Sequence, residues 1–113
     1  MNYWIVPSVL KQRLTKSEKE QLASDILKTV SNYYGISIED IKGKCRKRKI
    51  VKPRQVIMFL LRTKARMVLS DIGDVLNRDH TTVIHSITCI QNDITHPYDD
   101  SLEKDLININ ILL

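Results

Sequence analysis

Apolar residues recur at every third or fourth position in the first third of the chain, which is the spacing of one buried face of an α-helix. The residues on this face are Leu22, Ile26, Val30 and Tyr33. Ser17 and Glu20 have the spacing of a capping box, so the helix is predicted to begin near Ser17. Gly35 follows the last apolar position and is predicted to end the helix.

The middle of the chain contains its most apolar segment. Residues Val56 to Leu61 (VIMFLL) are apolar on nearly every side of a helix, which indicates a helix at the buried centre of the domain. Pro53 is tolerated in the first turn of a helix and is predicted to open this one. A short helix from Ser37 to Ile41, capped by Ser37, is predicted before it.

The next segment predicts two helices separated by a tight turn. The first runs from about Leu69 to Leu76, the turn lies at Asn77 and Arg78, and the second runs from about Asp79 to Ile94. The second helix has an apolar face and an opposite polar face. The apolar face consists of Val83, Ile87, Ile90 and Ile94, and the polar face carries Thr81, His85, Cys89 and Asn92.

The last predicted element is an amphipathic helix after Pro97, with apolar residues Leu102, Leu106 and Ile109. No segment alternates with the period of two that a strand requires, so the fold class is predicted to be all-α, a helical bundle containing a helix-turn-helix. The length of 113 residues suits one domain. We assign residues 17–113 to that domain and residues 1–16 to an N-terminal extension, in which Trp4 to Val6 either pack on the domain or hold a protein partner.

Composition argues against several classes of protein. No apolar run reaches the roughly 18 residues of a membrane span and no signal peptide opens the chain, so a cytoplasmic protein is expected. Cys45 and Cys89 are 44 positions apart, without the spacing of a zinc site or a disulfide framework. His80 and His85 are five apart, off the i, i+4 spacing of helical metal ligands. We therefore expect no metal, no cofactor and no enzymatic activity.

Positive charge is concentrated in one short segment. The formal charge is only +5, yet thirteen residues contain eight basic side chains and no acidic one. These are Lys42, Lys44, Arg46, Lys47, Arg48, Lys49, Lys52 and Arg54. Such a local positive field is typical of a surface that docks a polyanion, and double-stranded DNA is the expected partner.

The run RDHTTVIHS, Arg78 to Ser86, carries the chemistry of sequence recognition. Asp79 is placed to cap the second helix, and a helix N-terminus favours phosphate. His80, Thr81 and Thr82 then stand on the first turn, where side chains of recognition helices reach base edges. Threonine offers a hydroxyl and a methyl group to those edges, whereas the loop cations mostly supply affinity that is independent of sequence.

These residues, together with Pro53-Arg54-Gln55 and Ile72-Gly73, resemble the signature of the C-terminal DNA-binding domain of the bacterial replication initiator DnaA. The resemblance runs from about Ser17 to Leu112 and implies a helical fold related to the Trp repressor and a DnaA box as target. It also implies a bacterial, nucleoid-associated protein. It implies major-groove contacts for Asp79, His80 and Thr81, backbone contacts for Thr82 and His85, a minor-groove position for Arg46 and phosphate contacts for Arg54 and Gln55. Considered from charge alone, Lys47 and Arg48 are the alternatives to Arg46. The candidate DNA-binding residues are Arg46, Arg48, Lys52, Arg54, Gln55, Arg78, Asp79, His80, Thr81, Thr82 and His85.

The sequence departs from the family pattern in three ways. The turn before the signature is one residue shorter than is common in the family, and Cys89 stands where a basic residue is frequent. The three glycines, at positions 35, 43 and 73, do not form a G-x-x-x-x-G-K-[ST] loop, so no nucleotide is expected to bind. We expect a free-standing protein that uses the initiator's reading domain.

Two other functions compete with specific DNA binding. The first is a protein-interaction adaptor that holds its partner through the N-terminal segment and binds nucleic acid loosely through the basic loop. The second is single-stranded RNA binding, for which the interleaved exposed aromatic residues are missing.

Overall fold

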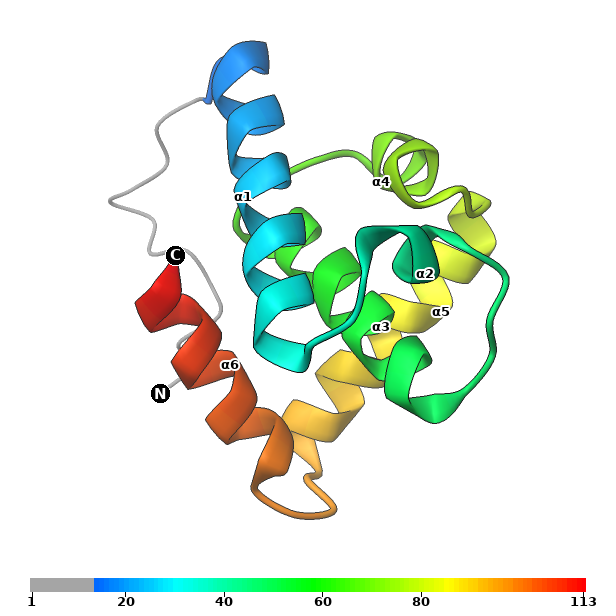
Figure 1. The fold of residues 1–113 in the computed structure, drawn as a ribbon, viewed down its shortest axis with the longest axis vertical. Coiled ribbons are helices and arrows are strands. Elements are labelled where there is room, and N and C mark those ends of the chain that lie inside the picture. The colour runs from blue at the N-terminus through cyan, green and yellow to red at the C-terminus, as the bar shows by residue number, and fades with distance from the viewer. Residues whose placement is uncertain (1–13) are drawn as a thin grey trace.

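The computed structural model of the protein describes residues 14–113, which form six helices and no strand (Figure 1). The helices are α1 (Lys16–Tyr34), α2 (Ile38–Lys42), α3 (Arg48–Thr63), α4 (Leu69–Leu76), α5 (His80–Thr95) and α6 (Ser101–Leu112). The predicted all-α fold with a helix-turn-helix is confirmed. The extension with Trp4, Ile5 and Val6 lies almost entirely outside the described residues, and its boundary with the domain stays a prediction.

The beginning of α1 corrects one prediction. Thr15, not Ser17, is the N-cap, because its side chain accepts a hydrogen bond from the backbone N–H of Glu18 at 3.1 Å. Thr15 and Glu18 also have the three-residue spacing of a capping box, so the pattern was present two positions earlier. Gly35 ends α1 as predicted, in the left-handed conformation with φ of 68°.

The beginning of α3 corrects a second prediction. Pro53 does not open this helix; it lies inside α3, more than one turn after Arg48. The carbonyl of Lys47 accepts hydrogen bonds from the N–H groups of Ile50 and Val51, and the buried side chain of Ile50 fixes the added turn on the core. Arg48 therefore belongs to a helix, and the loop between α2 and α3 is shorter than the charge run suggested.

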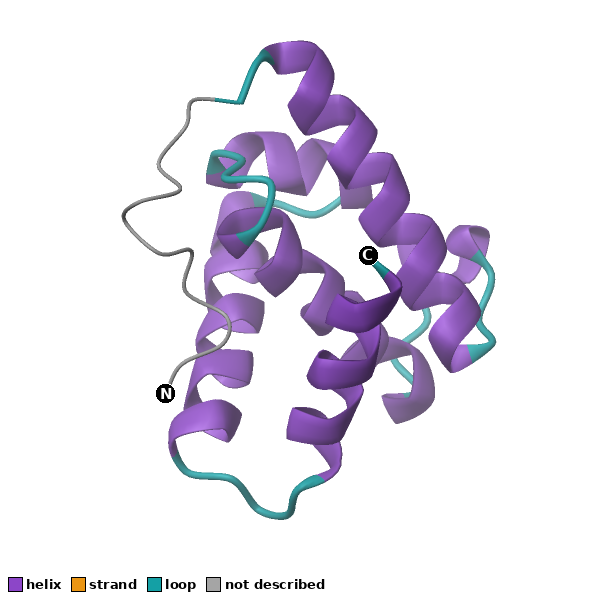
Figure 2. Cartoon of the chain, turned by 90° about the vertical axis from the view of Figure 1, so that its left-hand side faces the viewer, coloured by secondary structure: helices purple, strands orange, loops and turns teal. Residues whose placement is uncertain are grey.

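The core is built around α3, as its apolar sequence predicted. Val56 to Leu61 are all buried, and α3 packs against α1 on one side and α5 on another. Figure 2 shows α5 and α6 as an antiparallel pair joined by one loop. This arrangement holds α5 by its apolar face and leaves the opposite face to solvent.

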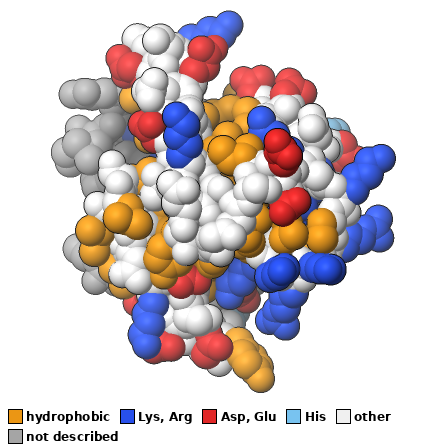
Figure 3. Space-filling view, viewed as in Figure 1, with side chains coloured by type: hydrophobic (Ala, Val, Ile, Leu, Met, Phe, Trp, Pro, Cys, Tyr) orange, Lys and Arg blue, Asp and Glu red, His pale blue; other side chains and the backbone are white. Residues whose placement is uncertain are grey.

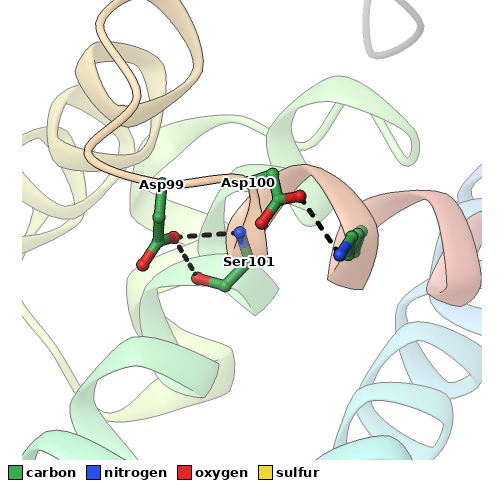
Figure 4. A network of polar contacts seen from close by, with 4 residues as sticks. Asp99, Asp100 and Ser101 are labelled. Carbon is green, nitrogen blue, oxygen red and sulfur yellow. Dashed lines mark hydrogen bonds and ion pairs between the residues drawn. The ribbon is translucent and has the colours of Figure 1, made fainter.

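Polar contacts attach α6 and the loop before it. The hydroxyls of Tyr33 and Tyr34 on α1 donate to the carboxylate of Asp105 on α6 at 2.8 and 2.9 Å. The pKa of Tyr34 is raised, mainly because the side chain is buried and to a smaller extent because of this hydrogen bond. In the loop before α6, the carboxylate of Asp99 accepts hydrogen bonds from the backbone N–H and the hydroxyl of Ser101 (Figure 4). An exposed ion pair joins Asp100 to Lys104, one helical turn later. No helix of the described part has the length and apolar character needed to cross a membrane.

Candidate nucleic-acid interface

The turn between α4 and α5 is closed by backbone contacts. Asn77 ends α4 in the left-handed conformation with φ of 55°, and the N–H of Arg78 donates to the carbonyl of Gly73 at 2.9 Å. A Cβ atom on Gly73 would lie 2.3 Å from the Arg78 carbonyl oxygen, so the approach of the turn to α4 requires glycine. The predicted two-helix unit thus has a turn of three residues, 77–79, between helices.

The first two turns of α5 present one exposed polar face. His80, Thr81, Thr82 and His85 are all exposed, as is the cap Asp79, whereas Val83, Ile87 and Ile90 are buried against the core as predicted. Ile94, the last member of the predicted apolar stripe, is only partly buried. The exposed groups are the hydroxyls and imidazoles together with the apolar side chain of Ile84, which is 45% exposed, and α5 has no Lys or Arg side chain.

Asp79 forms the predicted N-cap of α5. Its carboxylate accepts a hydrogen bond from the backbone N–H of Thr82 at 2.8 Å. The pKa of Asp79 is lowered most by the hydrogen bond from the backbone of Thr82 and next by the hydrogen bond from the Thr82 side chain. The nearby His80 lowers it further. Asp79 is thus held as a carboxylate, which can accept hydrogen bonds and cannot donate one.

The loop from Gly43 to Lys47 and the start of α3 carry the positive charge. Figure 3 shows Lys and Arg side chains gathered over this part of the molecule. The exposed members are Lys44, Arg46, Lys47, Arg48 and Lys49, and Lys42 and Lys52 are half-buried. Arg46 lies in the loop itself, where no helix restricts its backbone.

Arg54 is placed differently from the other cations. It is only 6% exposed, and its guanidinium donates to four backbone carbonyls of α2 and the basic loop. These carbonyls belong to Asp40 (3.2 Å), Ile41 (2.7 Å), Gly43 (3.2 Å) and Cys45 (3.0 Å). Burial, and then the charge of Arg78, lower the pKa of Arg54. Its expected phosphate contact stays a prediction, while the contacts present make it an anchor of the loop.

Arg78, the first residue of the signature, also faces the protein backbone. It is half-buried, and Nη1 donates to the carbonyls of Lys42 (3.3 Å), Leu76 (3.1 Å) and Asn77 (3.1 Å), while Nη2 donates to Gly43. Arg78 therefore connects the basic loop with the turn before α5. Sequence reasoning missed this role, because carbonyl acceptors 35 and 36 positions away leave no mark on side-chain identity.

Lys52 and Gln55 lie half-buried on α3. The charges of Lys52 and Arg48 add to the hydrogen bonds from Ser101 that lower the pKa of Asp99, so these cations have an acidic neighbour in the loop before α6. The predicted DNA contacts of Arg48, Lys52 and Gln55 stay predictions.

Nothing in the described part of the chain assembles a metal centre. No group of three or more His, Cys, Asp or Glu side chains comes together there. On α5, Nε2 of His85 lies 3.5 Å from Sγ of Cys89. Both residues are on the outward side of the helix, next to the face described above.

Comparison with known proteins identifies relatives of this chain. Residues 23–90 match the family model described as the bacterial DnaA protein helix-turn-helix. The chain is similar to the chromosomal replication initiator protein DnaA of Herpetosiphon aurantiacus, with 42% identity over 96 residues that cover 84% of this chain and 20% of the relative. DnaA 2 of Chlamydia caviae is 41% identical, covering 84% and 21%, and DnaA 1 of Chlamydia pneumoniae is 37% identical, covering 95% and 24%. The chain thus spans between a fifth and a quarter of the length of these relatives.

Proposed function

The chain belongs to the family of the bacterial DnaA helix-turn-helix, and on that premise we propose that it binds double-stranded DNA at a DnaA-box-like site. Family membership implies DNA binding in replication initiation. The proposal adds that this chain reads sequence through the first turns of α5, and that it acts in replication initiation or in its regulation.

The observation that carries the proposal is the pairing of two different surfaces across one turn. The exposed face of α5 offers uncharged hydrogen-bonding groups at Thr81 and Thr82, which suit base edges in the major groove. The basic loop beside it offers cations, which suit phosphates. Arg78 donates to the loop carbonyl of Gly43 and lies two positions before the start of α5, so the two surfaces are neighbours.

The two surfaces have different expected roles. Charges in the loop attract any duplex, because phosphates are the same at every base pair. Thr81 and its neighbours discriminate between base pairs, and a good base contact contributes about 1 to 3 kcal/mol of discrimination. Arg46 combines the two roles if it enters the minor groove, whose width depends on sequence.

The test is fluorescence anisotropy with a duplex that carries the family's box and a scrambled duplex of equal composition, each titrated over a series of salt concentrations. We expect a preference of at least about a hundredfold for the box, within the range that specific binders reach. If about five phosphates are neutralised, the slope of log K against log salt is near −4 to −5. The variant Thr81→Ala should lose most of the preference and keep the slope.

A steep salt dependence with equal affinity for both duplexes would contradict the proposed specificity. Selection from a random duplex pool would then show whether the short turn has changed the preferred site. The adaptor function predicts a different result, namely weak binding that is insensitive to sequence and a partner lost on replacing Trp4.

A further inference from the structure

Two arginines from different parts of the chain share one backbone acceptor. Arg54, on α3, and Arg78, in the turn before α5, both donate to the carbonyl oxygen of Gly43. Each makes further bonds around it, Arg54 to the carbonyls of α2 and the loop, and Arg78 to Lys42 and the end of α4. In Figure 1 the loop leaves α2 beside the α4–α5 turn, where these contacts lie.

Neither arginine of this pair is hydrogen-bonded to a carboxylate of residues 14–113. In the part of the chain that the structure describes, the hydrogen-bond partners of both guanidiniums are backbone carbonyls. Burial, and then the charge of Arg78, lower the pKa of Arg54, so repulsion between the two cations adds to the cost of burying one of them. The carbonyl dipoles, aimed at the guanidiniums from several directions, hold the pair together and fix the backbone of the loop.

We propose that Arg78 is a positioning residue for DNA recognition, which fixes the distance between the basic loop and the first turn of α5. The inference rests on the proposed function. Arg78 itself faces the backbone, and it acts through Arg46, whose loop it ties to the recognition helix. A loop held in place loses little freedom on binding, so Arg46 and α5 contact DNA as one unit. Lysine cannot replace Arg78, because an ammonium lacks the planar fork that reaches several carbonyls at once.

The test is a double-mutant cycle on the full chain, measured as affinity for the box duplex. We expect Arg46→Ala to weaken binding about tenfold in the wild type and less than about threefold in the Arg78→Lys background, because coupled residues lose their effects together. Lys49→Ala removes an exposed cation of α3 outside the loop, and its effect should be the same in both backgrounds. If Arg78→Lys only reduced the amount of folded protein, the effects of Arg46→Ala and Lys49→Ala would change by the same factor. A change in the effect of Arg46→Ala alone therefore indicates a positioning role and not a loss of stability.

Arg62→Lys is the matched control. Arg62 also donates to a loop carbonyl, that of Met67 at 2.9 Å, but it does so at the far end of α3. Arg46→Ala should cost the same in this background as in the wild type. A second measurement is amide hydrogen exchange over residues 43–47, which should be faster in Arg78→Lys and unchanged in Arg62→Lys. If Arg78→Lys does not fold, Arg78→Gln takes its place in the cycle.

Additive effects of Arg46→Ala and Arg78→Lys, or unchanged exchange in the loop, would overturn the inference. Failure of the proposed function has another signature, because the wild type would then bind box and scrambled duplexes equally. The wild-type preference is measured first, so the two failures are distinguished.

Discussion

The basic loop and the proposed recognition helix, which together make up the proposed interface, are held in place in opposite ways. The loop has exposed cations, and its backbone depends on side-chain donors from elsewhere, chiefly Arg54 and Arg78. The recognition helix α5 carries no Lys or Arg, satisfies its own backbone, is capped by Asp79 and is held by a buried apolar stripe. The cations thus lie on a loop whose backbone is held by other side chains. The residues proposed to read sequence lie on a helix that satisfies its own backbone hydrogen bonds.

This difference explains why the turn between α4 and α5 matters more than its three residues suggest. It separates α4 from α5 and also carries Arg78, which donates to the basic loop. A change in the turn should therefore affect both surfaces, whereas a change in either surface should affect only its own function.

The largest effect is expected from Gly73→Ala. In an ordinary helix this substitution would be favourable by up to about 1 kcal/mol. Here the added Cβ would lie 2.3 Å from the carbonyl oxygen of Arg78, and overlap with a backbone atom cannot be relieved by a side-chain rotation. We expect a net loss of about 1 to 3 kcal/mol in the free energy of unfolding, measured by chemical denaturation, together with loss of box preference.

Gly35→Ala is the control for that variant. Gly35 also has a special conformation, with φ of 68°, but its Cβ would meet nothing within 4 Å. Alanine at this positive φ is strained, so Gly35→Ala should lower the free energy of unfolding. It leaves the turn between α4 and α5 unchanged, so the preference for the box duplex should remain. Loss of preference in both variants would show that stability alone controls recognition.

The second effect separates the two surfaces directly. Thr81→Ala should cost about 1 to 3 kcal/mol on the box and little on scrambled DNA, because it removes a base contact. Lys47→Ala, in the loop, should weaken binding to both duplexes by the same factor, because it removes one phosphate contact. The slope of log K against log salt should become shallower by about 0.9. Anisotropy titrations over a salt series measure both quantities. If Thr81→Ala and Lys47→Ala changed the box preference and the salt slope equally, α5 and the basic loop would not have separate roles.

A smaller effect is expected from adding charge to the helix. Cys89 is half-buried on the outward side of α5, one turn after His85. Cys89→Lys should strengthen binding to box and scrambled duplexes by the same factor and steepen the salt slope by about 0.9. Cys89→Ser serves as the uncharged control. An increase in box preference would mean that this position contributes to sequence reading.

The smallest effect concerns the cap of α5 at low pH. The pKa of Asp79 is lower in the folded chain than its usual value, mainly through hydrogen bonds from Thr82. The stability that it contributes is therefore fully present above the usual pKa of about 3.9 and is lost as the pH falls through the lower folded value. Asparagine caps helices well and does not titrate. Thermal unfolding between pH 5 and pH 2.5 should therefore show a smaller decline for Asp79→Asn than for the wild type, and equal declines would assign the acid sensitivity to other carboxylates.

Most of the fold followed from local patterns in the sequence. The boundaries of α4 and the cap of α5 could be predicted because periodicity and capping act within a few residues. The two errors, at Ser17 and Pro53, have different causes. Thr15 offered an equally spaced cap, and Ile50 extended α3 in front of its proline because its side chain is buried.

The candidate site divides along the same line. The exposed polar face of α5 and the cluster of cations were evident in the sequence, because surface chemistry is carried by side-chain identity. Which arginines face outward was decided only by the tertiary structure. Arg54 and Arg78 carry the same charge as Arg46, and they face inward because folding brings backbone carbonyls within hydrogen-bond distance of their guanidiniums. Those acceptors belong to the backbone that every residue shares, so only the packing of α2 against α3 and α4 could determine their partners.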